Sequence, residues 1–463
     1  MPRVIVIGGG LSGLAAAYRI RQSSPGVELL LLEGRSRLGG NVRTEVRDGF
    51  TLEHGPNGFL DSKPATVRLC RDLGLGDRLL AASEGSRKNR YVYVRDRLHA
   101  LPASPLGLLR TPVLSWAGRL AMLAEPFRRR RGDVPADESV AEFARRRFGR
   151  EAADVFVDAL VTGIHAGDPE TLSVRAAFPR LPLFEKEAGS VLKGFFRAAK
   201  QRRVEAAARG EKSGPTRMWS FAGGLQELID ALAVSLAGVA RCGVSVTAIE
   251  KVANGWRVRG DGETWGADVV IDTAPAPAQA EHLAALDPPL AEELAAIRYN
   301  PVAVVLLGYR AADAPLNPDG FGYIAPQNTR RDVLGVQWCS SIFPGRAPPG
   351  FVLWRALCGG ANRADVAELP DDELLRAVHR EMQVVMGVTA PPAFAHVVRW
   401  PKAIPRYEVG HPARVERIEA RVAAHPGLIL GGNHLHGVAL NDCTEQAERI
   451  AEKVVRTPQV RVG

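Results

Sequence analysis

At the start of the chain, short apolar runs that are typical of strands flank a stretch with helical spacing of apolar residues. Val4 to Ile7 is a short apolar run that is typical of a buried strand. Apolar residues then recur at helical spacing, namely Leu11, Leu14, Ala15 and Tyr18. A second apolar run begins at Val27 and ends at Glu33. Strand, helix and strand in so short a stretch predict one βαβ unit of a parallel sheet.

The pattern becomes helical and basic from about Leu98 to Arg209. Thr111-Pro112 predicts the start of a helix. An apolar stripe follows at helical spacing, formed by Val113, Trp116, Ala117, Leu120 and Phe127. The basic cluster Arg128 to Arg131 comes directly after it. The segment from Lys200 to Pro215 has little apolar content, which predicts a mobile connection.

Strand-like runs return between Pro301 and Trp400, for example Val302 to Leu307 and Phe351 to Leu357. The chain ends with a strand, a glycine turn and a helix. We therefore expect an α/β fold, with a Rossmann-type nucleotide-binding domain, a mixed-sheet substrate domain and a helical domain. The expected boundaries are 1–85, 215–282 and 425–463 for the nucleotide-binding domain, 86–98 and 283–424 for the substrate domain, and 99–214 for the helical domain.

Composition narrows the class of protein. The 463 residues are 46% hydrophobic and 24% charged, which is typical of a folded chain with two or three lobes. The net charge of +9 suits nucleic acid, anionic lipid or an acidic ligand. Because no basic patch is interleaved with aromatic residues, we expect no nucleic-acid partner.

Five scattered cysteines without a C-x-x-C pair argue against a disulfide framework and against a metal site. They fit a reducing compartment, and we expect a cytoplasmic protein without a signal peptide. The longest apolar stretch, Leu106 to Phe127, is interrupted by Arg110 and Arg119 and does not predict a membrane span. An amphipathic helix in this stretch, with the arginines after it, fits peripheral contact with the inner face of an anionic cell membrane. The same stripe equally fits packing against neighbouring helices.

A phosphate-binding motif lies between the first strand and the first helix. The six residues that fit G-x-G-x-x-G are Gly8, Gly9, Gly10, Leu11, Ser12 and Gly13. Glycine permits the tight turn and the close approach of a pyrophosphate, and the helix N-terminus attracts phosphate charge. Glu33 stands 20 residues beyond Gly13, where its carboxylate can accept hydrogen bonds from ribose hydroxyls. Together these features predict a dinucleotide site.

Two further stretches favour FAD over NAD. Gly39-Gly40-Asn41 and the segment from Gly55 to Gly58 follow Glu33, where an NAD domain would continue with alternating strands and helices. The second glycine pair would let the backbone lie along an extended dinucleotide. Near the end, the amides of Val438, Ala439 and Leu440 precede a helix and would face an anion such as the reduced isoalloxazine. Asn441 and Asp442 in the same stretch could equally be helix caps.

Six stretches carry a resemblance to a known family. They are Asn89 to Tyr93, Leu98 to Pro102, Thr162 to Asp168, Gly320 to Ile324, Trp400 to His411 and Gly437 to Cys443. With the flavin motifs they cover nearly the whole chain in family order. The chain resembles the flavin amine oxidase superfamily and, within it, the protoporphyrinogen oxidase family.

The resemblance implies non-covalent FAD. The implied FAD contacts are Gly8, Gly9, Gly10, Leu11, Ser12, Gly13, Glu33, Asn41, Gly55, Pro56, Asn57, Gly58, Val246, Asn433, Val438, Ala439 and Leu440. The implied substrate contacts are Arg90 for a propionate, Phe321, Ile324 and Leu357 as an apolar clamp, and the backbone at Gly163. Taken without the resemblance, Arg90 equally fits a solvated arginine and the three apolar residues fit an ordinary core.

The implied activity is the oxygen-dependent, six-electron oxidation of protoporphyrinogen IX to protoporphyrin IX in heme biosynthesis, with hydrogen peroxide as the second product. The sequence leaves open coproporphyrinogen III as the substrate, another flavin amine oxidase or desaturase, and a flavin-bound scaffold without turnover. It also leaves open a monomer or a homodimer. No side chain is assigned as a catalytic base.

Two departures from the family lie at the flavin edge. Asn433 to Gly437 replaces segments that carry tyrosine or lysine, and Asn41 stands where amine oxidases usually carry arginine. They leave the tuning of the flavin open. His165, His434 and His436 are more simply explained by structural hydrogen bonds than by acid–base roles.

Overall fold

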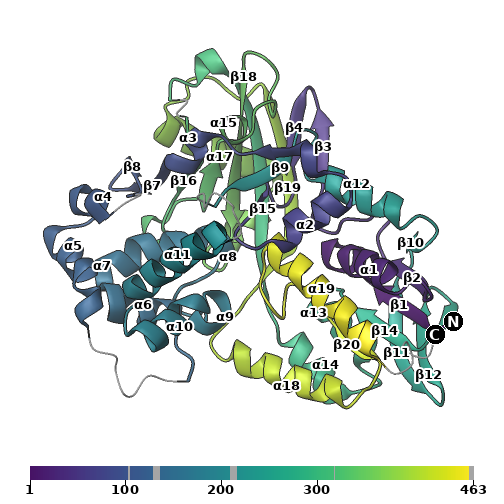
Figure 1. Ribbon diagram of the computed structural model, residues 1–463. Helices are drawn as coiled ribbons and strands as arrows, with labels where there is room; N and C mark the ends of the chain where they lie inside the picture. Colours follow the sequence, from purple (N-terminus) through teal and green to yellow (C-terminus); the bar gives the residue numbers. More distant parts are fainter. Residues whose placement is uncertain (103–104, 129–135, 209–215, 317–318, 458–463) are drawn as a thin grey trace. The chain divides into compact units, whose positions relative to one another are not determined.

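The chain folds into two compact units. The computed structural model describes residues 1–102, 105–128, 136–208, 216–316 and 319–457, and Figure 1 shows its elements. The first unit consists of residues 1–81, 218–298 and 413–463, and the second of residues 82–217 and 299–412. The helical segment and the mixed sheet belong to the same second unit. The protein thus has the expected α/β fold, with a nucleotide-binding unit assembled from three separate stretches of chain.

A five-stranded parallel sheet organises the first unit, in the order β10-β2-β1-β14-β20. Its strands are β1 (Arg3–Ile7), β2 (Glu28–Glu33), β10 (Ala240–Cys242), β14 (Val269–Asp272) and β20 (Leu428–Leu430). With α1 (Leu11–Ser23) between β1 and β2, the predicted βαβ unit is confirmed. Helices α1, α12 (Gln226–Ser235) and α19 (Leu440–Arg456) share one buried apolar cluster with this sheet. In Figure 1, α19 lies beside α1 although the two helices stand at opposite ends of the chain.

A seven-stranded mixed sheet organises the second unit, in the order β19-β15-β18-β17-β16-β7-β8. Its strands are β7 (Arg90–Val94), β8 (Arg97–Ala100), β15 (Tyr299–Arg310), β16 (Gly322–Ile324), β17 (Gly335–Gln337), β18 (Phe351–Gly359) and β19 (Phe394–Pro405). Both predicted runs, Val302 to Leu307 and Phe351 to Leu357, lie within these strands. One face of the sheet packs its apolar side chains against α17 (Asp371–Met386). On the opposite face, Val92 and Val94 form a second buried cluster with Val113, Val155 and Ala159.

The predicted helix start at Thr111-Pro112 is wrong. Helix α5 (Trp116–Leu123) begins later, because the Ser115 hydroxyl accepts a hydrogen bond from Gly118 N at 3.1 Å and caps the helix. The Thr111 hydroxyl instead accepts a bond from Val113 N and makes a local turn. Val113 thus precedes the helix and is buried, so it does not belong to the stripe of α5.

The predicted mobile connection is wrong for its first part. Helix α11 (Val191–Ala208) includes residues 200–208, and residues 209–215 lie outside the described part of the chain. Alanine, arginine, glutamine and glutamate dominate this part, and all four favour a helix whatever its apolar content. Among the described residues, no helix combines the length and the hydropathy that a bilayer crossing requires.

Candidate active site

The phosphate turn lies at the carboxyl end of β1. Gly8 has a φ of +99°, which a side chain would strain. A Cβ at Gly13 would stand 1.9 Å from the Gly8 carbonyl oxygen, so only glycine lets α1 start this close to the strand. The structural context that the motif requires is present: strand, tight turn and helix N-terminus.

The second glycine pair packs against this turn. Gly39 N donates a hydrogen bond to Gly9 O at 2.7 Å, and a Cβ at Gly40 would lie 3.0 Å from Gly10 Cα. Both Gly39 and Gly40 have positive φ angles. The pair therefore supports the phosphate turn through direct backbone contact, a role that the sequence did not indicate.

Glu33 ends β2 beside the same turn and is buried. Its Oε2 accepts a hydrogen bond from Gly9 N at 2.6 Å, and its Oε1 accepts one from Arg35 N at 2.8 Å. Val244 N donates to Glu33 O at 2.9 Å, which brings the start of β11 (Val246–Val252) to this end of the sheet. Glu33 and Val246 thus lie in one neighbourhood, where the ribose and adenine of FAD are expected.

The backbone segments at Asn41 and Gly55 pack closely against each other. A Cβ at Gly55 would stand 1.9 Å from the Asn41 carbonyl oxygen. Two residues further on, Asn57 is buried, and neither polar atom of its side-chain amide has a hydrogen-bond partner among the described residues. A buried amide without partners is costly, so a polar ligand is expected to complete it. This orphaned amide fits a bound polar ligand such as FAD.

At the amino terminus of α19, the hydrogen bonds show which residues cap the helix and which backbone amides are left for a ligand. Asp442 Oδ2 accepts a hydrogen bond from Ala439 N at 3.1 Å, so Asp442 caps the helix. Asn441 Oδ1 accepts one from the Thr66 hydroxyl at 2.7 Å instead. Within the described chain, the amides of Val438 and Leu440 have no acceptor. These two amides, rather than all three predicted ones, remain free to meet an anion.

Three predicted substrate contacts share one face of the seven-stranded sheet. Arg90 pairs with Gly322 across β7 and β16. Two residues along β16, Ile324 pairs with Gly335, which also pairs with Leu357. Side chains that lie opposite one another, or two residues apart on a strand, point to the same face. The face that carries Arg90, Ile324 and Leu357 is the one opposite α17.

Arg90 is the cation of this face. Its side chain is exposed, and its guanidinium carbon lies 4.7 Å from the centre of the Phe321 ring. No carboxylate of the described residues pairs with it. Enclosure by neighbouring atoms lowers the pKa of Arg90 below its ordinary value, but the group remains charged at neutral pH. An unpaired guanidinium on an apolar wall suits a carboxylate ligand.

Gly163 lies on α8 (Asp158–His165) and lets this helix approach the same face. A Cβ there would stand 2.7 Å from Ile324 Cδ1. A buried polar link holds the two elements together. Asp158 accepts hydrogen bonds from the Thr162 hydroxyl at 3.0 Å and from Gln327 N at 3.1 Å. Gln327 stands three residues beyond Ile324, so this link sets the separation between α8 and the apolar clamp.

Asp158 was not identified as a site residue from the sequence. Burial raises its pKa to about 6, and the hydrogen bonds from Thr162 and Gln327 oppose that rise. The available signal was its spacing, since Asp158 and Thr162 stand four residues apart on one helical face.

The three histidines have structural surroundings. His165 is buried against Phe178, and burial lowers its pKa to about 4. His436 is exposed and pairs with Glu419 at 2.8 Å. His434 is fully buried and bonds to Gln279. None of these contacts assigns a catalytic base.

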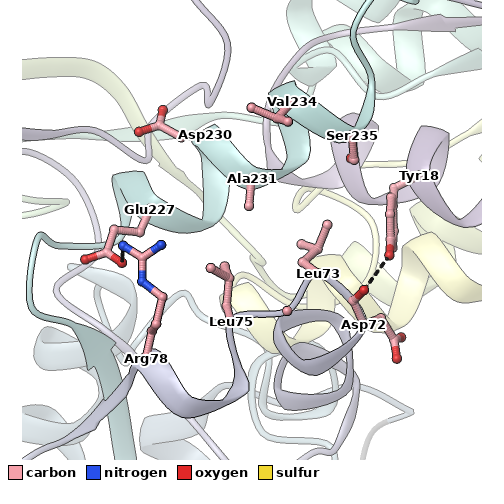
Figure 2. A pocket seen from close by; sticks show the side chains of 11 residues that line it. Tyr18, Asp72, Leu73, Leu75, Arg78, Glu227, Asp230, Ala231, Val234 and Ser235 are labelled. Carbon is pink, nitrogen blue, oxygen red and sulfur yellow. Dashed lines mark hydrogen bonds and ion pairs between the residues drawn. The ribbon is translucent and has the colours of Figure 1, made fainter.

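A hollow of about 600 Å³ lies elsewhere in the first unit, between α1, α12 and the turn after α2 (Ala65–Asp72). Figure 2 shows its apolar floor of Leu73, Leu75 and Ala231. Its rim is already paired, since Arg78 meets Glu227 and the Tyr18 hydroxyl donates to Asp72 O at 3.1 Å. No predicted site residue lines this hollow.

All predicted FAD contacts lie in the first unit, and all predicted substrate contacts lie in the second. Comparisons with known proteins identify the family of the chain. Residues 11–455 match the family described as flavin containing amine oxidoreductase. The chain is 30% identical over 464 residues to a protein of Bacillus subtilis (strain 168) named coproporphyrinogen III oxidase, covering 96% of both chains.

Two further relatives point the same way. A Bos taurus protein named protoporphyrinogen oxidase is 34% identical over 485 residues, covering 98% of both chains. A provisionally named protoporphyrinogen oxidase from Exiguobacterium sp. 255-15 has a similar crystal structure, with a TM-score of 0.83, 26% identity and 98% coverage of each chain. The family likeness therefore extends over nearly the whole molecule.

Proposed function

The chain belongs to the flavin containing amine oxidoreductase family, and from that premise we propose that it oxidises a porphyrinogen to its porphyrin in heme biosynthesis. It is an FAD-dependent oxidoreductase. The proposed substrate is protoporphyrinogen IX, and dioxygen is the proposed electron acceptor. FAD, when bound, would supply the redox chemistry: it would accept the equivalent of one hydride in each two-electron step, and dioxygen would reoxidise it with formation of hydrogen peroxide.

The observation that carries this proposal is the sheet face with Arg90, Ile324 and Leu357. A porphyrinogen is a large apolar macrocycle with carboxylates at its edge, and it needs apolar walls with few charges. The guanidinium of Arg90 supplies a fork for one propionate, and the apolar side chains supply a wall that excludes water. Because aromatisation drives the reaction, orienting the macrocycle is the main task of these residues.

Coproporphyrinogen III is the second candidate substrate, and one observation favours it: the Bacillus subtilis relative carries that name. It differs in bearing four propionates instead of two. A direct assay separates the candidates. Each porphyrinogen is added to the purified holoprotein in air, and the red fluorescence of the porphyrin is followed against a sample without protein. Faster oxidation of protoporphyrinogen supports the main proposal, and faster oxidation of coproporphyrinogen supports the alternative. If neither porphyrinogen is oxidised faster than in the sample without protein, the remaining reading is a flavin-bound scaffold without turnover.

The proposed location is the cytoplasm, with peripheral contact to an anionic membrane. Trp116, Leu120 and Phe127 are 69%, 62% and 86% exposed, which is unusual for large apolar side chains. The Arg119 guanidinium carbon lies 4.6 Å from the centre of the Trp116 ring, so a cation accompanies the apolar surface. Residues 129–131 of the basic cluster lie outside the described part of the chain. A membrane surface would also be where a poorly soluble porphyrinogen gathers.

A further inference from the structure

Gln279 joins the ends of two neighbouring strands beneath the FAD site. It lies on α13 (Ala276–Leu283) and is fully buried. Its side-chain nitrogen donates hydrogen bonds to Asp272 O and to Gly431 O, both at 2.8 Å. Asp272 ends β14, and Gly431 directly follows β20. The amide of Gln279 therefore holds together the two backbone segments that leave the sheet here.

These two bonds determine the orientation of the amide. The NH₂ group has two hydrogens, and both are used. The reverse orientation would place the Gln279 oxygen against two carbonyl oxygens. Oε1 is thus the acceptor that meets His434 Nε2 at 3.1 Å, and the imidazole must carry its proton on Nε2. The amide of Gln279 therefore fixes the tautomer of His434, which is fully buried.

His434 lies in the turn from Gly431 to Gly437, called here the flavin loop. Its backbone folds closely around the imidazole, since a Cβ at Gly432 would stand 2.8 Å from His434 Cε1. Gly432 also has a φ of +122°, which favours glycine. Asn433, the expected flavin contact, stands between Gly432 and His434. Its position therefore depends on the imidazole that Gln279 holds.

Polar side chains at the end of β14 also contact the phosphate turn. Thr273 directly follows Asp272, and its hydroxyl donates to Ile7 O at 2.8 Å. A Cβ at Gly8 would stand 2.9 Å from that hydroxyl oxygen. Asp272 itself pairs with His282 Nδ1 at 2.7 Å, and both side chains are buried. The end of β14 thus connects the phosphate turn with the flavin loop.

We propose that Gln279 and His434 are positioning residues that hold the flavin loop in the shape that binds FAD. Gln279 fixes the imidazole and both strand ends, and His434 supports the backbone of Asn433. The segment from Asn433 to Gly437, which departs from the family pattern, is on this account a loop with an internal histidine support. The proposal concerns FAD alone and holds for either porphyrinogen.

The test measures FAD release from the holoprotein, without any porphyrinogen. Three variants are compared with the wild type: Gln279→Leu, His434→Phe and His434→Gln. Gln279→Leu removes three hydrogen bonds at similar volume, and His434→Phe removes the donor at Nε2. His434→Gln places a donor nitrogen at nearly the same distance along the side chain and is the conservative variant. Free FAD is followed by its fluorescence after dilution, and the midpoint potential of the bound flavin is measured by dye equilibration.

A control variant loses a partly buried hydrogen bond outside the flavin-binding unit. Tyr309→Phe removes the bond between the Tyr309 hydroxyl and His379 Nδ1, which measures 3.0 Å in the second unit. It should release FAD at the wild-type rate with an unchanged potential. General destabilisation would instead move this control and the flavin-loop variants together.

We expect Gln279→Leu and His434→Phe to release FAD at least about tenfold faster, a change of the size expected when buried hydrogen bonds are lost. Their bound flavin should have a shifted midpoint potential. His434→Gln should return to within about threefold of the wild-type rate. Wild-type release by Gln279→Leu, or release by His434→Gln as fast as by His434→Phe, would refute the proposal. Should Gln279→Leu fail to fold, the two His434 variants decide the matter on their own.

Discussion

Arg90 is the proposed carboxylate anchor on the proposed substrate face. Its guanidinium lies 4.7 Å from the Phe321 ring centre and has no carboxylate partner among the described residues. On this proposal a propionate would gain a charge-assisted hydrogen bond from the guanidinium.

Arg90→Ala should raise the KM for porphyrinogen and leave the FAD content unchanged. The lost hydrogen bond to a charged group is worth about 1.5–3 kcal/mol, so kcat/KM should fall roughly tenfold or more. Arg90→Lys should recover only part of this loss, since an ammonium does not match the fork of a guanidinium. Steady-state kinetics of both variants check this. Wild-type kinetics of Arg90→Ala would place the propionate anchor elsewhere.

Asp158 makes the stability of the folded protein depend on pH. Its carboxyl is buried, and burial raises its pKa from 3.8 to about 6. Between these two values the folded protein keeps a proton that the unfolded chain has released. Stability is therefore lost as the pH rises through this window, by roughly 1–3 kcal/mol once the carboxyl is fully ionised.

Asp158→Asn should make the protein more stable at pH 8, and more stable by about half as much at pH 5, which lies inside the window between the two pKa values. The asparagine amide can donate to the Thr162 hydroxyl and accept from Gln327 N, so both links of the wild type are retained. Thermal unfolding of the holoprotein at the two pH values gives the measurement. An equal difference in Tm at pH 5 and pH 8 would contradict the assigned ionisation.

Helix α5 and the short turn after it present the apolar surface of the second unit. The Ser115 cap fixes where this helix begins, and so determines that Trp116 and Leu120 face outward while Val113 is buried. Phe127 follows in the turn Glu125–Phe127, and this turn is anchored by the fully buried pair of Glu125 and Arg147. The exposed side chains thus stand on a rigid base.

The triple variant Trp116→Ser, Leu120→Ser and Phe127→Ser should lose membrane binding. Removing this surface takes away the apolar contact with the acyl boundary, and the remaining charges hold only weakly. In liposome flotation the wild type should rise with anionic vesicles, less so at high salt, while the variant stays at the bottom. Equal flotation of the two proteins, or no flotation of the wild type, would remove this surface from a membrane role.

At the scale of the whole molecule, three distant stretches of chain build one FAD-binding unit. The phosphate turn and Glu33 lie in the first stretch, Val246 in the second and the start of α19 in the third. A ligand that contacts all three adds its binding free energy to the stability of the folded state.

Removal of FAD should therefore lower the Tm of the protein, and added FAD should restore it in proportion to the logarithm of its concentration. The bound flavin should be non-covalent. Acid precipitation of the yellow holoprotein should release FAD into the supernatant, where its absorption spectrum identifies it. Yellow colour that stays in the pellet, or NAD as the nucleotide released, would contradict this.

The sequence by itself determined the elements whose signal is local. The βαβ unit at the start, the phosphate turn and the long strands of the second sheet were predicted because each follows from the period of apolar residues or from a short glycine motif. The flavin family was predicted too, since its motifs run in order through the chain. Local signals failed where two hydroxyls stood close together: Thr111 makes a local turn, and Ser115 caps the helix.

Only the tertiary structure decided which distant residues meet. Arg90, Ile324 and Leu357 share a face because of strand register, which depends on pairings between residues far apart in the chain. The links of Asp158 to Gln327 and of Gln279 to His434 are likewise invisible in the sequence. A polar side chain shows what it can donate or accept, but its partner is set by the packing that buries both, and burial is what makes each bond matter.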